Sequence, residues 1–521
     1  MTSDSHRDPD PGETWHERSP ATGTGELPIL SPRPDPQTHR GYAHGTDPRR
    51  WRILAVLLVA IFMSLVAVSI INVGLPSIQE GLGASESQLQ WILSGYALTF
   101  GVVLVAGGRA GDVFGRGFLW MLGVAIFTLS SIAAGLAPDP TMLIVARFVQ
   151  GVGSGLLNPQ GVAMIQQYFK GAERGKAFGM LGSAVGVSVA IGPVLGGLLI
   201  QTGGASEGWR WLFVVNVPVG VVALVLAFLW FPRPLLRGPE GTTIRHALRE
   251  MDPTGAVLLG IALLATLLPF IEIGSPGTSP WVWALLAVAA MFLALWIAWE
   301  KHFKASGHQP MVDLDIFRVS SFLNGTLLIS LYFLGITSVW VLVTLYMQKG
   351  LGHTALAAGC VGLLNAFASA VASNLAGSRV NRMGRKIVVL GMLSVVVGLL
   401  LSMAVILLHD SWQISEWWLV LTLGFVGFGQ GAVVSPNQTL TLAEVPLEYA
   451  GSAGGVMQTG QRVGTAVGIA MITAVAYGVI ADQGWSVGIA AGLGVVMLVV
   501  LVALAVALRD MRHRARQDSR A

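Results

Sequence analysis

Two arginine residues stand inside long apolar segments, where a charged side chain has chemical consequences. Arg147 lies in the apolar block 141–165, and Arg462 lies near the middle of the block 452–480. A charge in the interior of a bilayer costs about 3 kcal/mol or more, so such a residue usually faces a cavity or a polar partner. Both arginines are therefore candidates for contact with a solute. Snorkelling toward the membrane surface remains the alternative for Arg147, which is closer to the end of its block.

A nine-residue pattern with an acid or amide at its centre occurs twice. The pattern G-x-x-x-[D/N]-x-x-G-R spans residues 108–116 and 377–385, in short turns between apolar blocks. Its residues with defined chemistry are Gly108, Asp112, Gly115 and Arg116 in the first copy and Asn381 and Arg385 in the second. A carboxylate at a helix end can cap the positive N-terminus of a neighbouring helix and pair with an arginine. The alternative is a solvated turn with a surface ion pair that contributes less than about 1 kcal/mol.

Groups that carry out enzyme chemistry are scarce in the apolar blocks. The single cysteine, Cys360, is interpreted as a packing residue, and the histidines fall in loops or tails. No phosphate-binding Walker loop is found, which argues against ATP-driven transport within this chain. We expect no catalytic residue, no metal ion and no cofactor, and the chain is not predicted to be an enzyme.

The elements that position these residues are membrane-spanning helices. The chain is 53% hydrophobic and 12% charged, with a mean hydropathy of +0.66, whereas soluble domains carry about 25% charged residues. Apolar blocks of the length that a spanning helix needs occur near 53–75, 88–107, 118–137, 141–165, 175–199, 211–231, 254–273, 281–299, 322–347, 355–378, 387–408, 416–440, 452–480 and 485–508. Barrel strands would be shorter and would alternate in polarity. The predicted fold class is an all-α polytopic membrane protein with about fourteen spans.

The basic residues predict topology rather than nucleic-acid binding. Most Lys and Arg residues fall on one side if residues 1–50 are cytoplasmic, with clusters after every second span. This is the positive-inside pattern, and it places both termini in the cytoplasm. We expect a multi-pass protein of the plasma (inner) membrane with a small-molecule substrate, the lipid bilayer as its surroundings, no nucleic-acid partner and a monomeric state.

The repeated turn predicts the domain organisation. If two bundles are built alike, the second turn falls after span 10 and span 9 opens the second bundle, so that spans 7 and 8 are an inserted pair. Repeated halves with a substrate site between them are a common transporter design. The predicted parts are a disordered tail at 1–50, a six-helix bundle at 51–232, a linker with two inserted helices at 233–300, a second six-helix bundle at 301–508 and a basic tail at 509–521.

Several segments together resemble the major facilitator superfamily, and within it the fourteen-helix drug:proton antiporter family. Besides the turn at 108–116, they are Arg147-Phe-Val-Gln150-Gly151-Val-Gly153, Gly192-Pro193-Val-Leu-Gly196-Gly197, Asn72-Val-Gly-Leu-Pro76 and Trp209-Arg-Trp-Leu-Phe-Val-Val-Asn216-Val-Pro218. The resemblance covers roughly residues 50–508. It implies a fold of two six-helix bundles with an inserted helix pair, and alternating access between them.

The resemblance also implies roles for particular residues. It implies that Asp112 latches the two bundles together on the cytoplasmic side, with the start of span 13 near Gly451 and Ser452 as its partner. Asn381 keeps a hydrogen bond but no charge, so the first turn is expected to matter more. Gly192, Pro193, Gly196 and Gly197 match the antiporter motif of helix 5, although glycines in membrane helices also serve static tight packing.

The chain departs from the antiporter pattern where a proton-carrying group is expected. The family's aspartate in helix 1 corresponds to Ala67, and no Asp or Glu lies at mid-depth in spans 1–6 or 9–14. Proton coupling needs a group in the transport path whose pKa can move near neutral pH. Asp112 and Glu272, near the end of span 7, are the candidates, or the carrier is not a proton antiporter.

The predicted function is secondary active export of amphipathic small molecules, such as a drug, an antibiotic or an endogenous metabolite. Because the deep charges are positive, neutral or anionic compounds are favoured over quaternary cations. The candidate residues of the substrate path are Asn72, Trp91, Tyr96, Gln150, Asn158, Asn365, Gln458 and Gln461, each of which could instead make an interhelical hydrogen bond worth about 0.6 kcal/mol. A metabolite importer or an uncoupled facilitator of the same fold is the alternative, and a non-transporting receptor is a weaker one.

Overall fold

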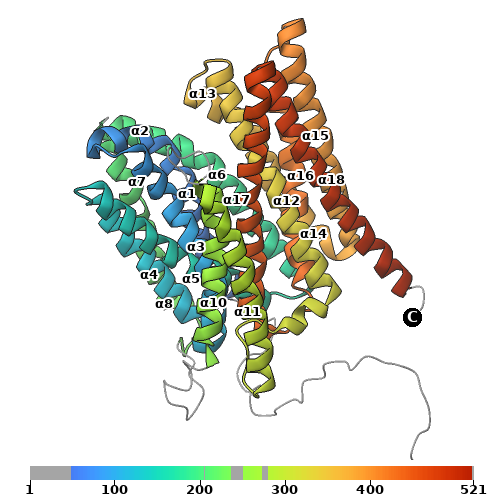
Figure 1. Cartoon of the computed structure of the whole chain (residues 1–521). Coiled ribbons are helices and arrows are strands. Elements are labelled where there is room, and N and C mark those ends of the chain that lie inside the picture. Colours follow the sequence, from blue (N-terminus) through green and yellow to red (C-terminus); the bar gives the residue numbers. More distant parts are fainter. Residues whose placement is uncertain (1–48, 205, 236–249, 273–279, 519–521) are drawn as a thin grey trace, which may run out of the picture. The chain divides into compact units, whose positions relative to one another are not determined.

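The structure is a computed structural model that describes residues 49–204, 206–235, 250–272 and 280–518, without the side chains of 189–190, 355–356 and 512–518. The described residues belong to one compact unit and form only helices as regular elements (Figure 1). Fourteen of these helical segments are long and apolar enough to cross a membrane. The predicted all-helical fold is therefore confirmed, while the predicted disordered tail lies outside the described residues except at its last two positions.

The first six spans pack against one another and form what we call the first bundle. Its helices are α1 (Arg50–Ser69), α2 (Ile71–Leu82), α3 (Glu86–Phe114), α4 (Arg116–Gly135), α5 (Pro140–Tyr168), α6 (Gly171–Gly203), the short α7 (Trp211–Val214) and α8 (Asn216–Trp230). Helix α5 packs against both α3 and α4, while α1 packs against α6 and α8.

The last six spans form a second bundle in the same way. They are α12 (Ser320–Leu345), α13 (Ala355–Cys360), α14 (Leu363–Met383), α15 (Arg385–Trp412), α16 (Trp418–Thr441), α17 (Ala450–Gln483) and α18 (Trp485–Asp518). Helix α16 packs against α14 and α15, and α12 packs against α17 and α18. Helix α18 runs ten residues past the predicted end of the last span, because the stretch after residue 508 contains good helix formers and neither Gly nor Pro.

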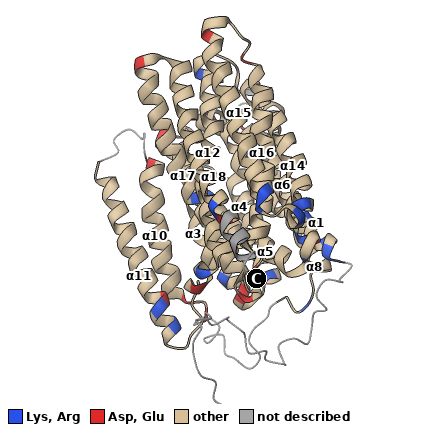
Figure 2. Cartoon of the chain, turned by 90° about the vertical axis from the view of Figure 1, so that its right-hand side faces the viewer, with Lys and Arg blue, Asp and Glu red and all other residues tan. Residues whose placement is uncertain are grey.

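The inserted pair consists of α10 (Pro253–Glu272) and α11 (Leu285–Ala305). The two helices pack on each other, and α10 also contacts α3 of the first bundle and α17 of the second. Helix α11 has the most exposed span of the fourteen, and Figure 2 shows the pair together at one edge of the helices. The pair therefore covers the line along which α3 and α17 meet.

Glycine allows the backbones of the two bundles to touch at two places. A Cβ on Gly108 would lie 2.2 Å from the carbonyl oxygen of Gly451, and one on Gly175 would lie 2.1 Å from the carbonyl oxygen of Gly377. Gly108 and Gly377 are the first residues of the two repeated turns. The contacts α3–α17 and α6–α14 are thus matching contacts at one end of the bundles, which we call the loop-motif end.

The two turns depend on glycine for a second reason. Gly115 and Gly384, the eighth residues of the two copies, have φ values of +104° and +54°. Side chains disfavour these backbone conformations, whereas glycine adopts them readily. Each glycine ends one span and starts the next, so the pattern fixes a tight turn between α3 and α4 and between α14 and α15.

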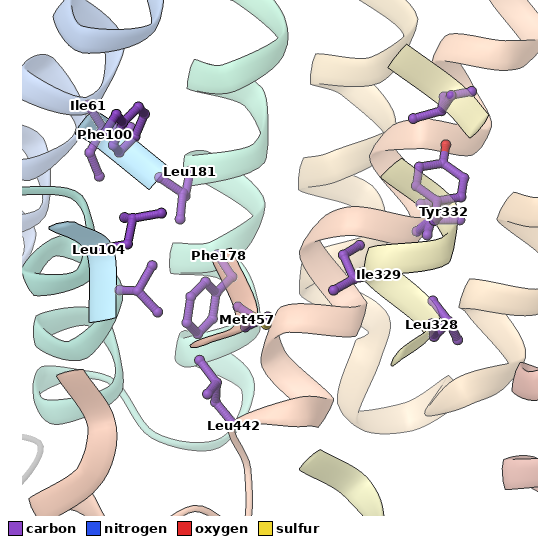
Figure 3. Close-up of a cluster of buried hydrophobic side chains, with 14 of the residues drawn as sticks. Ile61, Phe100, Leu104, Phe178, Leu181, Leu328, Ile329, Tyr332, Leu442 and Met457 are labelled. Atoms are coloured by element: carbon purple, nitrogen blue, oxygen red, sulfur yellow. The ribbon is translucent and has the colours of Figure 1, made fainter. Parts of the chain in front are cut away.

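Apolar side chains fill the space between the bundles near the loop-motif end. Figure 3 shows Leu104 from α3, Phe178 from α6, Met457 from α17 and Leu442 beyond α16 close to one another. All four belong to one cluster of buried residues. This end of the protein is therefore closed by packing as well as by backbone contact.

Candidate functional site

The carboxylate of Asp112 joins the two bundles at the loop-motif end. The backbone N–H of Gly451 lies 3.1 Å from both of its oxygens, and the N–H of Ser452 lies 3.1 Å from Oδ2. These donors belong to the first turn of α17, where amides lack intrahelical acceptors and the helix dipole favours an anion. The Asp112 side chain is only 3% exposed, so this contact is made largely away from water.

Arg116 neutralises Asp112 and extends the junction to other segments. Its Nη2 and Nε lie 2.9 and 3.2 Å from Asp112 Oδ1, and its Nη1 donates to Gln167 Oε1 at 3.0 Å. Nη2 also donates to the carbonyl of Leu447, just before α17. The pair therefore ties α3, α4 and α5 of the first bundle to the entry of α17.

Further hydrogen bonds between the bundles lie from the loop-motif end to about mid-depth. Gln166 donates to the carbonyls of Leu442 at 2.9 Å and Val445 at 3.1 Å. Ser183 donates to the carbonyl of Ala370 at 2.6 Å and accepts from Asn374 at 2.6 Å. Opening this end would have to break these bonds together with those of Asp112.

The second copy of the turn makes different contacts. Arg385 is buried within the second bundle, where Nε donates to Asp510 Oδ2 at 2.9 Å and Nη1 donates to Asn437. Asn381 is exposed and makes no hydrogen bond to other residues that the structure describes, which differs from the hydrogen bond expected from the sequence. It lies near the start of α6, with its Nδ2 4.0 Å from where a Cβ on Gly171 would be. An uncharged amide gains less than a carboxylate from that helix terminus.

Arg147 makes its polar contacts inside the first bundle. Its Nε donates to the carbonyl of Ile92 at 2.9 Å, its Nη1 donates to Gln150 Oε1 at 2.7 Å, and its guanidinium lies 4.3 Å from the centre of the Tyr96 ring. The residue is 1% exposed. Arg147 therefore does not snorkel, and its contacts orient α5 against α3.

Several residues predicted for the substrate path are also hydrogen-bonded within their own bundle. Gln150 donates to Ser131 at 2.8 Å, the Tyr96 hydroxyl pairs with Ser154 at 2.7 Å, Asn158 donates to Ser64 Oγ at 3.3 Å, and Asn365 donates to the Leu423 carbonyl at 3.0 Å. All four are buried. Trp91 stacks on Phe148 at 6.1 Å, and Asn72 is exposed. These four residues therefore make hydrogen bonds between helices, which was the alternative to a role in the substrate path.

Arg462 has a different environment from Arg147. Its guanidinium lies 4.2 Å from the centre of the Phe100 ring on α3, and it makes no hydrogen bond or ion pair with the residues that the structure describes. The amide nitrogens of Gln458 and Gln461 are buried and also lack an acceptor in the described structure. Residues three and four apart share one face of a helix. We call these three residues of α17 the donor face.

The antiporter motif lies in α6, the fifth span, and its glycines pack against the end of α1. A Cβ on Gly192 would lie 1.9 Å from Ser69 Oγ, and one on Gly196 would lie 3.0 Å from an Ile70 side-chain carbon. Gly197 has nothing within 4 Å of its Cβ position, and Pro193 lies in the interior of α6. Two glycines of the motif thus allow close contact with the end of α1, whereas the space beside Gly197 is unoccupied.

The structure places the acidic candidates far apart. Asp112 is at the loop-motif end, whereas Glu272 is the last residue of α10, at the opposite end of that helix. Ala67 is buried in the apolar cluster. Asp252 and Glu300, two buried acids at the base of the inserted pair, were missed because their positions at span ends suggested solvent. No cluster of metal-ligating residues is found in the described residues.

Two repeated helical bundles with a charged junction between them have the architecture of a membrane carrier. The chain matches the Major Facilitator Superfamily over residues 57–469 and again over 326–521. It belongs to this superfamily and is a multi-pass secondary transporter of small molecules, as the resemblance of its motifs predicted.

Relatives and solved structures agree with this assignment. The chain is 31% identical to the probable actinorhodin transporter of Streptomyces coelicolor, over 90% of this chain and 79% of that protein. It is 32% identical to the puromycin resistance protein of Streptomyces alboniger, over 91% and 94%. In fold it is similar to the human organic anion transporter TETRAN, with a TM-score of 0.60 and 15% identity, covering 88% of this chain and all of that one.

Proposed function

We propose that this protein exports amphipathic small molecules that carry hydrogen-bond acceptors or a negative charge, by alternating access between its two bundles. The observation that carries the proposal is the donor face of α17. The buried amide nitrogens of Gln458 and Gln461 have no acceptor in the described structure, and the Arg462 guanidinium lies over the Phe100 ring without a hydrogen-bond acceptor among the described residues. Unpaired buried donors are costly, and a solute with carbonyl, phenolate or carboxylate oxygens would satisfy them.

The surroundings of the donor face favour an amphipathic solute. Phe100 lies against the Arg462 guanidinium, and the Cβ position of Gly101 is 3.8 Å from Arg462 Cβ and 3.4 Å from a side-chain carbon of Leu267 on α10. Pockets for small molecules combine apolar and aromatic walls with a few placed polar groups. A cation would meet the positive charge of Arg462, which forms no ion pair with an acid in the described part of the chain, so neutral and anionic compounds are preferred.

Export is the direction supported by relatives. The puromycin resistance protein of S. alboniger and the tetracenomycin C resistance and export protein of Streptomyces glaucescens (28% identical over 82% of this chain) are named for resistance or export. By the positive-inside pattern the loop-motif end and both termini are on the cytoplasmic side of the plasma membrane. The closed loop-motif end then corresponds to a state that faces outward.

A transport assay with purified protein tests the proposal. Proteoliposomes would be given neutral, anionic and cationic amphiphiles of similar size, with and without an imposed pH gradient. We expect transport of the neutral and anionic compounds, accelerated by the gradient in the direction opposite to proton movement. Transport restricted to permanent cations would contradict the substrate class, and uptake driven with the protons would contradict export.

An uncoupled facilitator is the second candidate, and one observation favours it. The helix 1 position that carries an aspartate in the antiporters is Ala67, which is packed among apolar residues. Flux of the same compounds that ignores the pH gradient would support this candidate instead of proton-coupled export.

A further inference from the structure

Two buried carboxyl groups face each other where the inserted pair meets the loop-motif end. Asp252 immediately precedes α10 and is 0% exposed, and Glu300 lies near the end of α11 and is 1% exposed. The Cβ position of Gly255 would lie 2.2 Å from Asp252 Oδ2 and 3.0 Å from Glu300 Oε1. Asp252 Oδ2 thus occupies the position that a side chain at residue 255 would fill, and Glu300 Oε1 lies beside that position.

The hydrogen bonds of this pair are incomplete. Asp252 Oδ1 accepts from the Gly255 N–H at 2.9 Å and from the Trp299 indole N–H at 2.8 Å. Asp252 Oδ2 and both oxygens of Glu300 have no partner in hydrogen-bond geometry among the described residues. Burying two ionised carboxylates whose oxygens lack hydrogen-bond partners would cost a large free energy.

The donors that surround Glu300 are neutral. The backbone N–H groups of Met311 and Val312 and the indole of Trp296 face its carboxyl group, but none of them reaches hydrogen-bond geometry. A neutral donor stabilises a carboxylate less than a cation does. These groups therefore leave Glu300 without a counter-charge.

The basic groups around the pair are engaged elsewhere. On α3, Arg109 donates to the carbonyl oxygen of Glu250 from Nε at 3.2 Å and from Nη2 at 3.0 Å. On α11, Lys304 binds Asp313 Oδ1 at 2.7 Å and Asp315 Oδ2 at 2.5 Å. The neighbouring Lys301 and His302 are exposed. Tyr449 at the entry of α17 lies near the charges of Asp313, Glu448, Lys304 and Arg109. No cation in the described structure forms an ion pair with Asp252 or Glu300.

We propose that Asp252 and Glu300 form a proton-binding site that holds one proton between them. Two adjacent buried carboxylates cannot both ionise readily, whereas a carboxylic acid beside a carboxylate carries a single charge. The shared proton lets one carboxyl donate to the other and satisfies oxygens that otherwise lack a partner. Release breaks one O–H bond, sends the proton to water and leaves two carboxylates.

The same turn that carries Asp112 also holds the segments that carry the acid pair. Arg109 donates to the carbonyl of Glu250, two residues before Asp252, and to the carbonyl and side chain of Gln309, each at 3.3 Å, beyond the end of α11. Arg109 is less than one helical turn from Asp112, so separation of α3 from α17 would move these segments. Protonation of the pair would therefore depend on whether the loop-motif end is closed. This coupling rests on the proposed function, whereas the proton site does not.

Infrared difference spectroscopy of the full-length protein in lipid nanodiscs tests the site without any transport assay. Raising the pH of wild-type protein should remove the carbonyl band of a buried, protonated carboxyl and release one proton per chain. Glu300→Gln, which is close in shape, should lack both signals, whereas Glu272→Gln should keep them. Absence of a protonated carboxyl in the wild type at neutral pH would overturn the proposal, as would an unchanged band in both Glu300→Gln and Asp252→Asn.

Two further measurements distinguish a proton site from a metal-cation site and connect it to transport. If sodium ions displace the signal at constant pH, the site binds a metal cation and the proposal fails. In proteoliposomes, Glu300→Gln should retain exchange of substrate down its gradient and lose transport driven by a pH gradient. If the wild type shows the carboxyl band but no transport of any tested compound, the site stands and the proposed function fails.

Discussion

Asp112 and Gly451 are 339 positions apart in the chain, yet the carboxylate of one accepts the backbone N–H of the other at 3.1 Å from each oxygen. The contact places an anion at the start of a 34-residue helix of the opposite bundle. Its strength depends on charge, since an aligned helix terminus and Arg116 both favour a carboxylate. This contact makes the closed loop-motif end the natural target for mutation.

Asp112→Asn should weaken closure of the loop-motif end. The amide keeps one acceptor for the α17 terminus but loses the ion pair with Arg116, which is then left buried without its counter-charge. We expect at least a tenfold lower transport rate, corresponding to about 1.4 kcal/mol, measured as flux in proteoliposomes. Asn381→Ala is the matched control and should transport normally, because Asn381 is exposed. Equal loss in both variants would argue against a special role for the first turn.

Gly108→Ala should keep the bundles apart at the loop-motif end without unfolding either. The added Cβ would lie 2.2 Å from the Gly451 carbonyl oxygen, which belongs to the other bundle. Thr459 on α17 is buried, so in a Cys360→Ser, Thr459→Cys background the thiol at residue 459 should react faster with a membrane-impermeant thiol reagent applied at this end. Gly197→Ala, which meets nothing within 4 Å, should leave the reaction slow. Equal reactivity of the two variants would mean that the backbone contact is not required for closure.

Arg462→Gln should lower affinity for anionic substrates more than for neutral ones. A hydrogen bond to a charged group contributes about 1.5–3 kcal/mol, so the dissociation constant of an anionic compound should rise by about tenfold or more. Binding to purified protein, measured by calorimetry with a neutral and an anionic compound of the same skeleton, checks this. Identical losses for both compounds would show that Arg462 acts through packing.

Arg147→Gln should reduce stability rather than change substrate preference. The substitution leaves the carbonyl of Ile92 and the side chain of Gln150 without their buried donor, at a cost of about 1–3 kcal/mol for each unsatisfied group. We expect a lower midpoint of thermal unfolding in detergent and an unchanged ratio of affinities for anionic and neutral compounds. A changed ratio with normal stability would place Arg147 in the substrate path.

The sequence by itself determined the membrane class, the fourteen spans and the residues of the repeated turn. These follow from local quantities, namely the length of apolar blocks and the spacing of glycine and charge, which need no knowledge of distant contacts. Asp112 could be recognised in this way because a short turn fixes its place at a helix end. The same reasoning made Arg147 and Arg462 equally good candidates for contact with a solute, since both are cations in apolar blocks.

Only the tertiary structure decided which polar groups are satisfied and which are left for a ligand. Arg147 finds an acceptor on α3, whereas Arg462 lies over the Phe100 ring without a hydrogen-bond acceptor among the described residues. Asp252 and Glu300 come from opposite ends of the inserted pair's sequence, 48 positions apart, and each alone looks like a solvated helix end. Their pairing depends on how α10 and α11 fold back on each other and on the bare surface of Gly255. Hydrogen bonding and burial are properties of neighbours in space, which the order of residues does not specify.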